Sequence, residues 1–451
     1  MARGKKKETL TPEERLQVAL VPEGEQPYKV PRNWCWVRLE LLLRSSKEKT
    51  EEFSDADLKY VGLEHMQKDG GIVAYDSAER VKSLKNVFHP QQILYGKLRP
   101  YLNKHDIATF DGVCSTDILV FNATSVTIPK FVNFFLDQDT FIEYAVSNSK
   151  GINLPRVSES VVLDAKCPLP PIYEQHRIVD RIESLFAKLD EAKQKAQDAL
   201  DSFETRKAAI LHKAFTGELT AQWRKEHGVG MESWERHPLK DVTQIGSGGT
   251  PSRKNSQYYL GDILWVKTGE IYWNYIYDSE EKITEEAIAN SSAKLYPAGT
   301  VLVAMYGQGL TRGRAAILGV PATTNQAVCA LQPCDCLEKR YLYYYFMANY
   351  WEYREKAVGG NQPNYSATMI GKWIINKPSV LEQAEIVRLL DDLLAKEQQA
   401  KETAKGVLEQ IDLIKKAILA RAFRGELGTN DPSEESAVEL VKRAIERGEK
   451  A

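Results

Sequence analysis

The chain has 451 residues, which is enough for two or three domains with hydrophobic cores of their own. Its 60 basic and 62 acidic side chains nearly cancel, so total charge alone does not indicate a nucleic-acid partner. No apolar run approaches the length that spans a bilayer, and the first residues lack the apolar core of a signal peptide, so we expect a cytoplasmic protein without membrane contact.

Six cysteines in a chain of this length do not form a disulfide framework. Cys329, Cys334 and Cys336 are close enough in sequence to suggest a metal, but a fourth ligand at the usual spacing is missing. We therefore expect reduced, structural thiols and no metal site.

Residues 1–30 are polar and charged, and we interpret them as an N-terminal arm rather than a domain. The series Thr11-Pro12-Glu13-Glu14 is typical of a capped helix start and predicts a short helix from Thr11 to Leu20. The basic run from Lys5 to Lys7 could contact phosphates, although we expect a solvated tail.

Residues 31–169 form the first of two variable parts. Runs of β-type residues between turn signals predict strands at 71–75, 92–95, 117–121 and 160–164, and a run rich in Phe and Tyr predicts a helix at 130–147. This pattern is typical of a mixed α and β domain. Its cations are concentrated in a predicted strand end and loop at 97–104, and Lys150 and Arg156 follow close to the helix.

The segment 170–219 occurs twice, the second time at 378–427. Glu-Gln-x-x-Ile-Val opens both copies and Ala-Phe-x-Gly-Glu-Leu closes both, with Gln175 recurring as Gln383 and Gly217 as Gly425. Upstream, Gly151-x-Asn-x-Pro recurs as Gly359-x-Asn-x-Pro at the same offset. The chain is therefore two half-chains, each with a variable part followed by a shared helical element.

Apolar residues in both copies follow an alternating four-three spacing, which predicts a coiled-coil seam. The predicted seam consists of Ile178, Ile182, Leu185, Leu189, Phe203 and Ile210 in the first copy and Ile386, Leu390, Leu393, Ile411 and Ile418 in the second. Arg206 and Glu397 are the polar exceptions, one in each copy. One helix cannot bury so narrow a stripe, so we expect the copies to pair antiparallel. The alternative is two separate amphipathic helices, each packed on its own domain.

Residues 220–231 look like a polar linker, and 232–377 form the second variable part. Glycines and cations occur together in Gly246–Lys254 and again in Gly307–Arg314, with Trp and Tyr residues between the two stretches. Such groups contact phosphates and base edges, but they equally decorate ordinary loops. The glycines match neither a P-loop nor the dinucleotide fingerprint.

No constellation of residues supports catalysis. The nucleophile elbow, the zinc-protease motif and the Pro-Pro-aromatic loop of amino-methylating enzymes are all missing from the sequence. His176 and His212 lie on the first repeated helix, where Ala384 and Ala420 replace them in the second copy, so we interpret both as helix-surface histidines.

The repeated motifs, together with the stretch from Gly249-Thr-Pro251 to Gly261-Asp-Ile-Leu-Trp265, resemble the DNA-specificity subunit of type I restriction-modification systems. The resemblance covers nearly the whole chain from Pro31 onward. It implies an α+β fold in which two mixed α/β target recognition domains are joined by two long helices that form an antiparallel coiled coil with a pseudo-two-fold repeat. Applied to this chain, the domains are 31–169 and 232–377, the spacer helices are 170–219 and 378–427, and 428–451 is a tail with a short helix.

The resemblance also implies a function. Each recognition domain would read one half of a split double-stranded DNA site, and the helices would act as a spacer and as docking sites for two methyltransferase subunits, joined by restriction and translocase subunits. S-adenosylmethionine would belong to the methyltransferase and ATP and Mg to the restriction subunit, with no cofactor on this chain. Base-reading residues do not carry over by motif. Our candidates are Lys97, Arg99, Lys104 and Arg156 in the first domain and Arg253, Lys254, Gln308, Arg312 and Arg314 in the second.

Two hypotheses from other classes stay open. A coiled-coil adaptor would bind proteins through both domains without contacting DNA, and its binding would lack the steep salt dependence of phosphate contacts. A stand-alone enzyme would show turnover from the isolated chain. The near-neutral charge favours a subunit that depends on its partners for many phosphate contacts.

Overall fold

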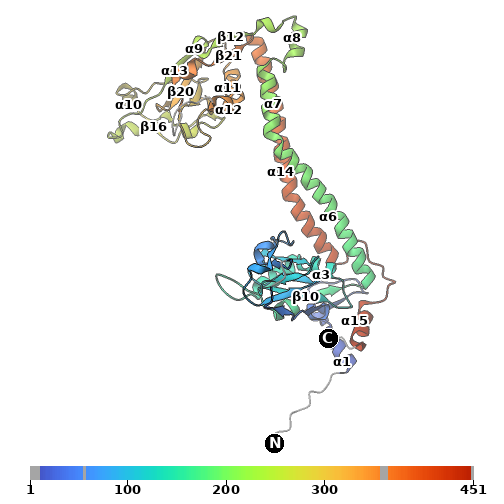
Figure 1. Ribbon diagram of the computed structural model, residues 1–451. Coiled ribbons are helices and arrows are strands. Elements are labelled where there is room, and N and C mark those ends of the chain that lie inside the picture. The colour runs from blue at the N-terminus through green and yellow to red at the C-terminus, as the bar shows by residue number, and fades with distance from the viewer. Residues whose placement is uncertain (1–10, 54–56, 356–363, 448–451) are drawn as a thin grey trace. The chain divides into compact units, whose positions relative to one another are not determined.

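The computed structural model describes residues 11–53, 57–355 and 364–447 (Figure 1). The chain divides into two compact units, which we treat separately: unit 1 comprises 1–196 and 406–451, and unit 2 comprises 197–405. The basic run from Lys5 to Lys7 and the second Gly-x-Asn-x-Pro motif, 359–363, lie outside the described residues.

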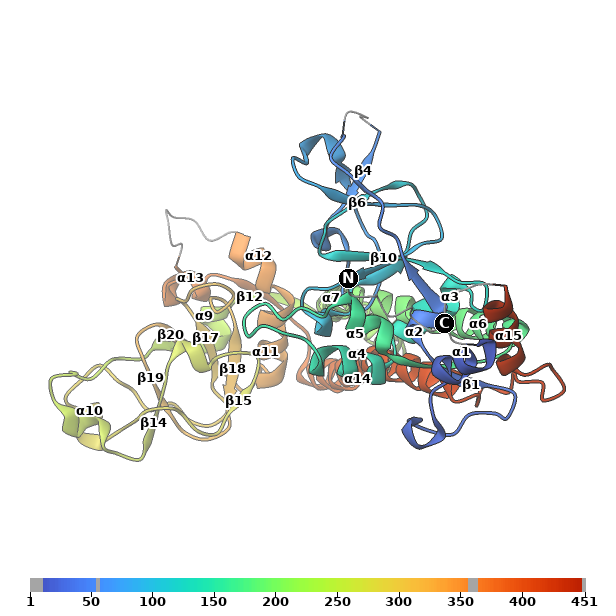
Figure 2. The same cartoon turned by 90° about the horizontal axis from the view of Figure 1, so that it is seen from below.

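Unit 1 is a mixed α and β structure. Its strands are β1 (Cys35–Arg38), β2 (Leu43–Ser45), β3 (Lys49–Thr50), β4 (Lys59–Val61), β5 (Asp76–Ser77), β6 (Lys85–Phe88), β7 (Ile93–Gly96), β8 (His105–Ile107), β9 (Gly112–Cys114), β10 (Ile118–Ala123) and β11 (Lys166–Leu169). Its helices are α1 (Pro12–Ala19), α2 (Leu39–Leu42), α3 (Pro129–Leu136), α4 (Asp139–Ser147), α5 (Glu159–Asp164), α6 (Ile172–Asp201) and α15 (Ala437–Glu446). The sheets are β2-β10-β7-β8, β3-β6-β9-β4-β5 and β1-β11, and Figure 2 shows β4 and β6 to one side of β10.

The start of α1 is as predicted, because Thr11 and Glu14 exchange the two hydrogen bonds of a capping box. Two predicted strands of unit 1 are wrong. Residues 160–164 belong to α5, since the Ser158 hydroxyl accepts from the Val161 N–H and caps a helix there. In 71–75 only Ile72 pairs, in an isolated bridge to Met66. The predicted helix at 130–147 is divided into α3 and α4.

Unit 2 repeats this architecture with insertions. Its strands are β12 (Glu235–Pro238), β13 (Thr243–Ser247), β14 (Ile263–Val266), β15 (Tyr275–Ile276), β16 (Lys282–Ile283), β17 (Val301–Ala304), β18 (Ala315–Leu318), β19 (Thr323–Thr324), β20 (Val328–Pro333) and β21 (Ile374–Lys377). Its helices are α7 (Phe203–Phe215), α8 (Ala221–His227), α9 (Leu239–Val242), α10 (Glu285–Ala289), α11 (Lys339–Ala348), α12 (Tyr350–Glu355), α13 (Ala367–Gly371) and the first part of α14 (Val380–Phe423). Its sheets are β13-β20-β17-β18-β15, β16-β14-β19 and β12-β21. The order β13-β20-β17-β18 matches β2-β10-β7-β8 of unit 1.

The predicted linker 220–231 is not simply polar coil, because it contains α8. Thr220 and Arg224 are buried there, so this segment is part of the folded unit 2.

The first long helix is interrupted, whereas α14 runs without a break. The Ser202 hydroxyl donates to the Ala199 carbonyl at 3.1 Å, and Arg206 reaches both Ser202 and the same carbonyl. Side chains that compete for helical carbonyls disturb a helix locally, so α6 ends at Asp201 and α7 begins at Phe203.

Both units pair their long helices in opposite directions. In unit 1, Asp190 contacts Lys415 at 2.6 Å and Lys193 contacts Asp412 at 4.0 Å, so residue numbers fall along α14 as they rise along α6 (Figure 1). In unit 2, the two polar exceptions of the seam meet, since Arg206 pairs with Glu397 at 2.8 Å, and Glu204 contacts Lys401 at 3.6 Å, which gives the same opposed order. All eleven predicted seam residues are buried or half-buried.

The expectation of reduced cysteines is wrong for one pair. Cys334 and Cys336 form a disulfide, because the turn between β20 and α11 brings their Cα atoms to 5.3 Å. Cys35, Cys114, Cys167 and Cys329 are free and buried, and burial raises the pKa of each thiol.

The described ranges contain neither a helix suited to cross a membrane nor a cluster of metal-ligating side chains. No helix in them is both long enough and apolar enough to cross a bilayer. Within the same ranges, no three His, Cys, Asp or Glu side chains are grouped so that they could hold a metal ion.

Candidate nucleic-acid interface

Three of the four candidates in unit 1 lie on one β-hairpin. The loop between β7 and β8, residues 97–104 (hairpin loop 1), contains a short helical turn at Pro100–Leu102. Arg99 and Asn103, on either side of that turn, adopt left-handed backbone conformations with φ of 52° and 42°. Such conformations are unfavourable for side chains larger than glycine, so this loop holds a specific shape only with support from its surroundings.

A neighbouring loop, residues 150–156 (the tip loop), supplies part of that support. It carries the Gly-x-Asn-x-Pro motif and is closed by two hydrogen bonds of 2.9 and 2.8 Å exchanged between the main chains of Lys150 and Arg156. The Arg99 N–H donates to the Pro155 carbonyl at 2.7 Å. The Val157 N–H donates to the Lys97 carbonyl at 3.0 Å. The motif therefore helps to shape the cationic hairpin.

The candidate cations of unit 1 differ in how firmly they are engaged. The Arg156 guanidinium pairs with Asp117, which raises the pKa of Arg156 mainly through the hydrogen bond. The Lys104 ammonium donates to the Leu63 carbonyl at 2.7 Å. By contrast, the side chains of Lys97 and Arg99 have no ion pair or hydrogen bond within the described parts of the chain. These two cations are available to an anionic ligand without breaking an ion pair or hydrogen bond, although the charge of Lys97 also acts on Glu159.

Lys97 also lines a polar cavity of about 230 Å³. Lys47 and Lys49 share this cavity, although Lys47 is already bound to both oxygens of Glu159 at 2.7 and 2.8 Å. Lys47 and Lys49 are not among the candidates predicted from the sequence, because they lie about 50 residues before hairpin loop 1 and belong to no motif.

A buried histidine anchors the base of hairpin loop 1. His105 is fully buried, with one ring nitrogen 2.8 Å from the Asn133 side-chain oxygen and the other 2.9 Å from Asp137. The Asn103 amide donates to the same Asp137 oxygen at 3.1 Å. Burial by itself lowers the pKa of His105, but the charge of Asp137 and the hydrogen bonds raise it overall. No sequence pattern identified this cluster, since its members come from β8 and α3.

The corresponding loop of unit 2 joins β17 to β18. Residues 305–314 (hairpin loop 2) include three candidates, Gln308, Arg312 and Arg314. Just as Val157 bonds Lys97 in unit 1, the Tyr365 N–H donates to the Met305 carbonyl at 3.1 Å. Candidates selected separately in the two halves of the sequence thus lie on equivalent hairpins of equivalent sheets.

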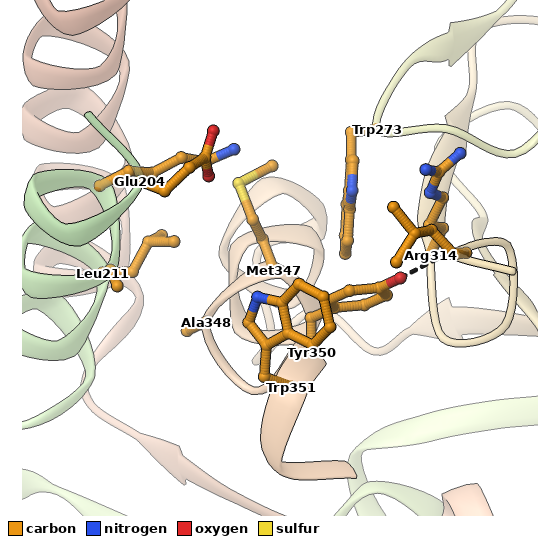
Figure 3. Close-up of a pocket in the computed structure, with 11 residues that line it drawn as sticks. Glu204, Leu211, Trp273, Arg314, Met347, Ala348, Tyr350 and Trp351 are labelled. Atoms are coloured by element: carbon orange, nitrogen blue, oxygen red, sulfur yellow. Dashed lines mark hydrogen bonds between the residues drawn. The ribbon is translucent and has the colours of Figure 1, made fainter. Parts of the chain in front are cut away.

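Side chains of α12 support hairpin loop 2. The Arg354 guanidinium donates to the Arg312 carbonyl at 2.6 Å and to the Gly309 carbonyl at 2.8 Å. The Tyr350 hydroxyl donates to the Leu310 carbonyl (Figure 3). Sequence analysis missed both residues, because the contacts span about 40 positions of the chain.

Hairpin loop 2 also borders a cavity of about 420 Å³ within unit 2. Figure 3 shows Trp273, Tyr350 and Trp351 around it, with Leu211 of α7 on the opposite side. Arg314 and Lys207 contribute cations to the lining, and burial lowers the pKa of the Lys207 ammonium. Arg314 therefore lies beside aromatic rings at the base of its hairpin.

The last two candidates lie outside the hairpin. Arg253 is bonded to Glu281 at 2.5 Å and stacks over the Tyr259 ring at 4.1 Å from its centroid. The ion pair also acts on the carboxylate, because the hydrogen bond from Arg253 is the main cause that lowers the pKa of Glu281 to about 2. Lys254, next in sequence, is exposed. Arg253 is thus already committed to a structural ion pair, and Lys254 is the more accessible cation.

The repeated Glu-Gln motif makes equivalent contacts in both units. Gln175 accepts from the Ile128 N–H and donates to the carbonyls of Val126 and Pro170. Gln383 makes the same three contacts with Glu338, Cys336 and Pro378. Both glutamines are completely buried, so each one fixes the start of a long helix to its own unit.

The preceding glutamates join each helix start to the segment that follows the other copy. Cluster 1 consists of Glu174, Arg177, Thr429 and Glu434, and cluster 2 of Thr220, Arg224, Trp234 and Glu382. In each cluster a threonine hydroxyl donates to the buried glutamate at 2.6 Å, and an arginine pairs with it at 2.7 or 2.6 Å. Burial raises the pKa of Glu174. The repeated Glu-Gln motif therefore makes the same polar contact in both units, between its glutamate and a threonine hydroxyl.

Comparisons with known proteins agree with this architecture. Residues 231–410 match the type I restriction modification DNA specificity domain. The chain is 33% identical to the type I restriction enzyme EcoDI specificity subunit of Escherichia coli, over 50% of this chain and 52% of that protein. It is also 33% identical to the MjaIX specificity subunit of Methanocaldococcus jannaschii, over 42% of this chain and 44% of that protein. The chain thus spans about half the length of these curated relatives.

Solved structures extend the likeness in fold. The HsdS subunit from Thermoanaerobacter tengcongensis is similar with a TM-score of 0.66 and 22% identity, over 89% of this chain and 100% of that one. A chain from a study of complex assembly and conformational transition in the type I R-M system has a TM-score of 0.67 and 23% identity over the same shares. Residues 231–410 are thus similar to a type I restriction modification DNA specificity domain, and the fold of the chain is similar to that of an HsdS subunit over 89% of its length.

Proposed function

We propose that this chain is the non-catalytic subunit that gives a type I restriction-modification complex its DNA sequence specificity. Unit 1 reads one half of a split double-stranded DNA site and unit 2 reads the other half. Their recognition domains are 31–169 and 232–377. The two half-sites differ in sequence because the two hairpin loops differ in sequence.

The observation that carries this proposal is the equivalence of the hairpin loops. Both join the same pair of strands in sheets of the same order, and both present cations selected from the sequence alone. Arginine and glutamine can form paired hydrogen bonds with base edges, whereas lysine mainly neutralises phosphate. We assign base contacts to Arg99, Gln308, Arg312 and Arg314, and phosphate contacts to Lys97, Lys104 and Lys254. Arg156 and Arg253 would first have to exchange a carboxylate for DNA.

The long helices act as the spacer between the half-sites. Opposed contacts within each unit support an antiparallel coiled coil, and the sequence repeat supports the pseudo-two-fold internal repeat. The 44 residues of α14 correspond to about 66 Å, at 1.5 Å per residue. That length equals roughly 19 base pairs at 3.4 Å each, so the helices can set a separation of more than one turn of DNA.

The matching repeated helices offer two equivalent docking places, and we assign to them the docking of two methyltransferase subunits. These partners bring S-adenosylmethionine, and restriction and translocase subunits bring ATP and Mg. Because the net charge of this chain is only −2, the partners also contribute much of the phosphate contact. The complex works in the cytoplasm, where the DNA is.

Single-molecule methylome sequencing tests the proposal. A host without modification expresses this chain with its methyltransferase, and a split, asymmetric motif should be methylated only when both are present. A chimera in which another domain replaces residues 31–169 should change one half of the motif and leave the other half and the spacing intact. A complex that assembles but methylates no motif would favour a protein adaptor instead.

A further inference from the structure

The tip loop of unit 1 exposes aliphatic side chains. Ile152 is fully exposed, at 100% of its reference area, and Leu154 is 46% exposed. Neither contributes to the hydrophobic core of unit 1. Aliphatic groups held in water at the end of a loop are typical of a contact surface rather than of a folding element.

The exposure belongs to a defined conformation. Lys150 and Arg156 close the loop with two main-chain hydrogen bonds, and Gly151 takes a φ of 105° that other residues rarely adopt. A Cβ atom on Gly151 would lie 3.0 Å from the Leu154 carbonyl oxygen, so the loop is too tight for a larger residue there. The loop is also bonded to hairpin loop 1 through Arg99 and Pro155. Ile152 and Leu154 are therefore presented on a supported turn.

The charges around this turn indicate which ligand covers it. Lys150 lies at the first end of the turn, and the hairpin with Lys97 and Arg99 is bonded to the second end through Pro155 and Val157. None of these three cations has a side-chain ion pair in the described residues. Arg156, which closes the turn, is paired with Asp117. An aliphatic tip with three further cations near it is complementary to DNA, whose phosphates are anionic and whose major groove exposes one apolar group, the thymine 5-methyl.

The internal repeat shows which positions of the loop vary. The second copy keeps the Gly, Asn and Pro of the motif, but it has Gly360 and Gln362 where the first has Ile152 and Leu154. A constant frame with variable positions is what two readers of different sequences require. Gln362 offers the amide that pairs with adenine, whereas Ile152 and Leu154 offer only apolar surface.

We infer that Ile152 and Leu154 contact thymine methyl groups in the half-site recognised by unit 1. The inference rests on the proposed function and adds to it two specificity-determining residues that are not polar. It predicts that the half-site of unit 1 contains thymine at one position or at two neighbouring positions.

The test uses the complex of the full chain with its methyltransferase and DNA carrying its methylated motif. Each thymine of the motif is replaced in turn by deoxyuridine, which removes only the 5-methyl group. At one or two positions in the unit 1 half-site, Kd should rise about fourfold per lost methyl. The double variant Ile152→Ala with Leu154→Ala should bind the unmodified site more weakly and should no longer distinguish thymine from deoxyuridine there. Val18→Ala, at an exposed aliphatic residue of α1, should respond to deoxyuridine as the parent chain does.

The alternative results are distinct. A half-site without thymine, or equal deoxyuridine effects in the parent and the double variant, overturns the inference and leaves the proposed function standing. Loss of the methyltransferase from the double variant in size-exclusion chromatography also overturns it, because the tip would then contact protein. Failure of the parent complex to bind any split site would instead remove the proposed function itself.

Discussion

The two hairpin loops have the same place in the fold but different supports. Hairpin loop 1 is held from below by buried His105 and from the side by the tip loop. Hairpin loop 2 is held by two side chains of α12, Tyr350 and Arg354. The helix starts, by contrast, are fixed in both units by the same glutamine and glutamate contacts. The contacts that fix the helix starts thus repeat between the units, whereas the supports of the two hairpin loops differ.

The largest expected effect concerns the two clusters, which are alike in chemistry but not in burial. The pair of Arg224 and Glu382 is 9% and 1% exposed, whereas Arg177 in cluster 1 is 37% exposed. Arg224→Ala leaves a buried carboxylate without its cation, and it should lower the free energy of unfolding by about 3–5 kcal/mol. Arg177→Ala should cost less, because the half-exposed Arg177 guanidinium is screened by water, although Glu174 itself is fully buried. Chemical denaturation of the full chain, followed by a probe in each unit, measures both.

Arg388→Ala is the matched control for that pair of variants. Arg388 forms a surface pair with Glu385, and its removal should change the unfolding free energy by less than about 0.5 kcal/mol. Equal losses of unfolding free energy in Arg224→Ala and Arg177→Ala would contradict the prediction that burial of the arginine sets the size of the effect.

An intermediate effect is expected from the support of hairpin loop 2. Tyr350→Phe removes the hydroxyl that bonds the Leu310 carbonyl, at a cost of about 1 kcal/mol in stability. Because the loop loses one support, methylome sequencing should show relaxed specificity in the half-site of unit 2 and no change in the other. Tyr144→Phe in unit 1, which removes an exposed hydrogen bond to Asp164, is the control. Relaxation of both half-sites would mean that the loop supports are not specific to a unit.

The smallest expected effect is on the pH dependence of unit 1. Since the folded pKa of His105 is raised, the stability that it contributes is fully present below its ordinary pKa of about 6.5. This contribution is lost as pH rises through the raised value. His105→Gln should therefore flatten the fall in stability of unit 1 between mildly acidic and mildly basic pH.

His89 also has a raised pKa, through hydrogen bonds with Asp111 and Glu48. The difference between the parent chain and the His105 variant isolates the contribution of the buried ring. An unchanged pH slope would show that Asp137 does not hold the His105 proton.

What the sequence could predict was set mainly by local patterns. The spacing of Ile178, Ile182 and their counterparts predicts long helices, and the same spacing marks Arg206 and Glu397, which form an ion pair, as its polar exceptions. The apolar run at 160–164 predicts a strand, but Val-Val-Leu suits a short buried helix equally well. Only the Ser158 cap distinguishes the helix from the strand. The supports at His105 and Tyr350 could not be predicted, since their partners are distant in sequence.

Unit 1 contains both ends of the described chain, and this has a consequence for biosynthesis. Asn33 accepts from the Ala437 N–H at 2.9 Å, and Trp34 donates to Asn430 at 3.1 Å. Gly425 fits against Pro31, where a Cβ would approach to 2.4 Å. Unit 2 is one continuous segment, so it can be completed on the ribosome first. Unit 1 is begun first but is finished last, and until residues 406–447 emerge its start must remain open.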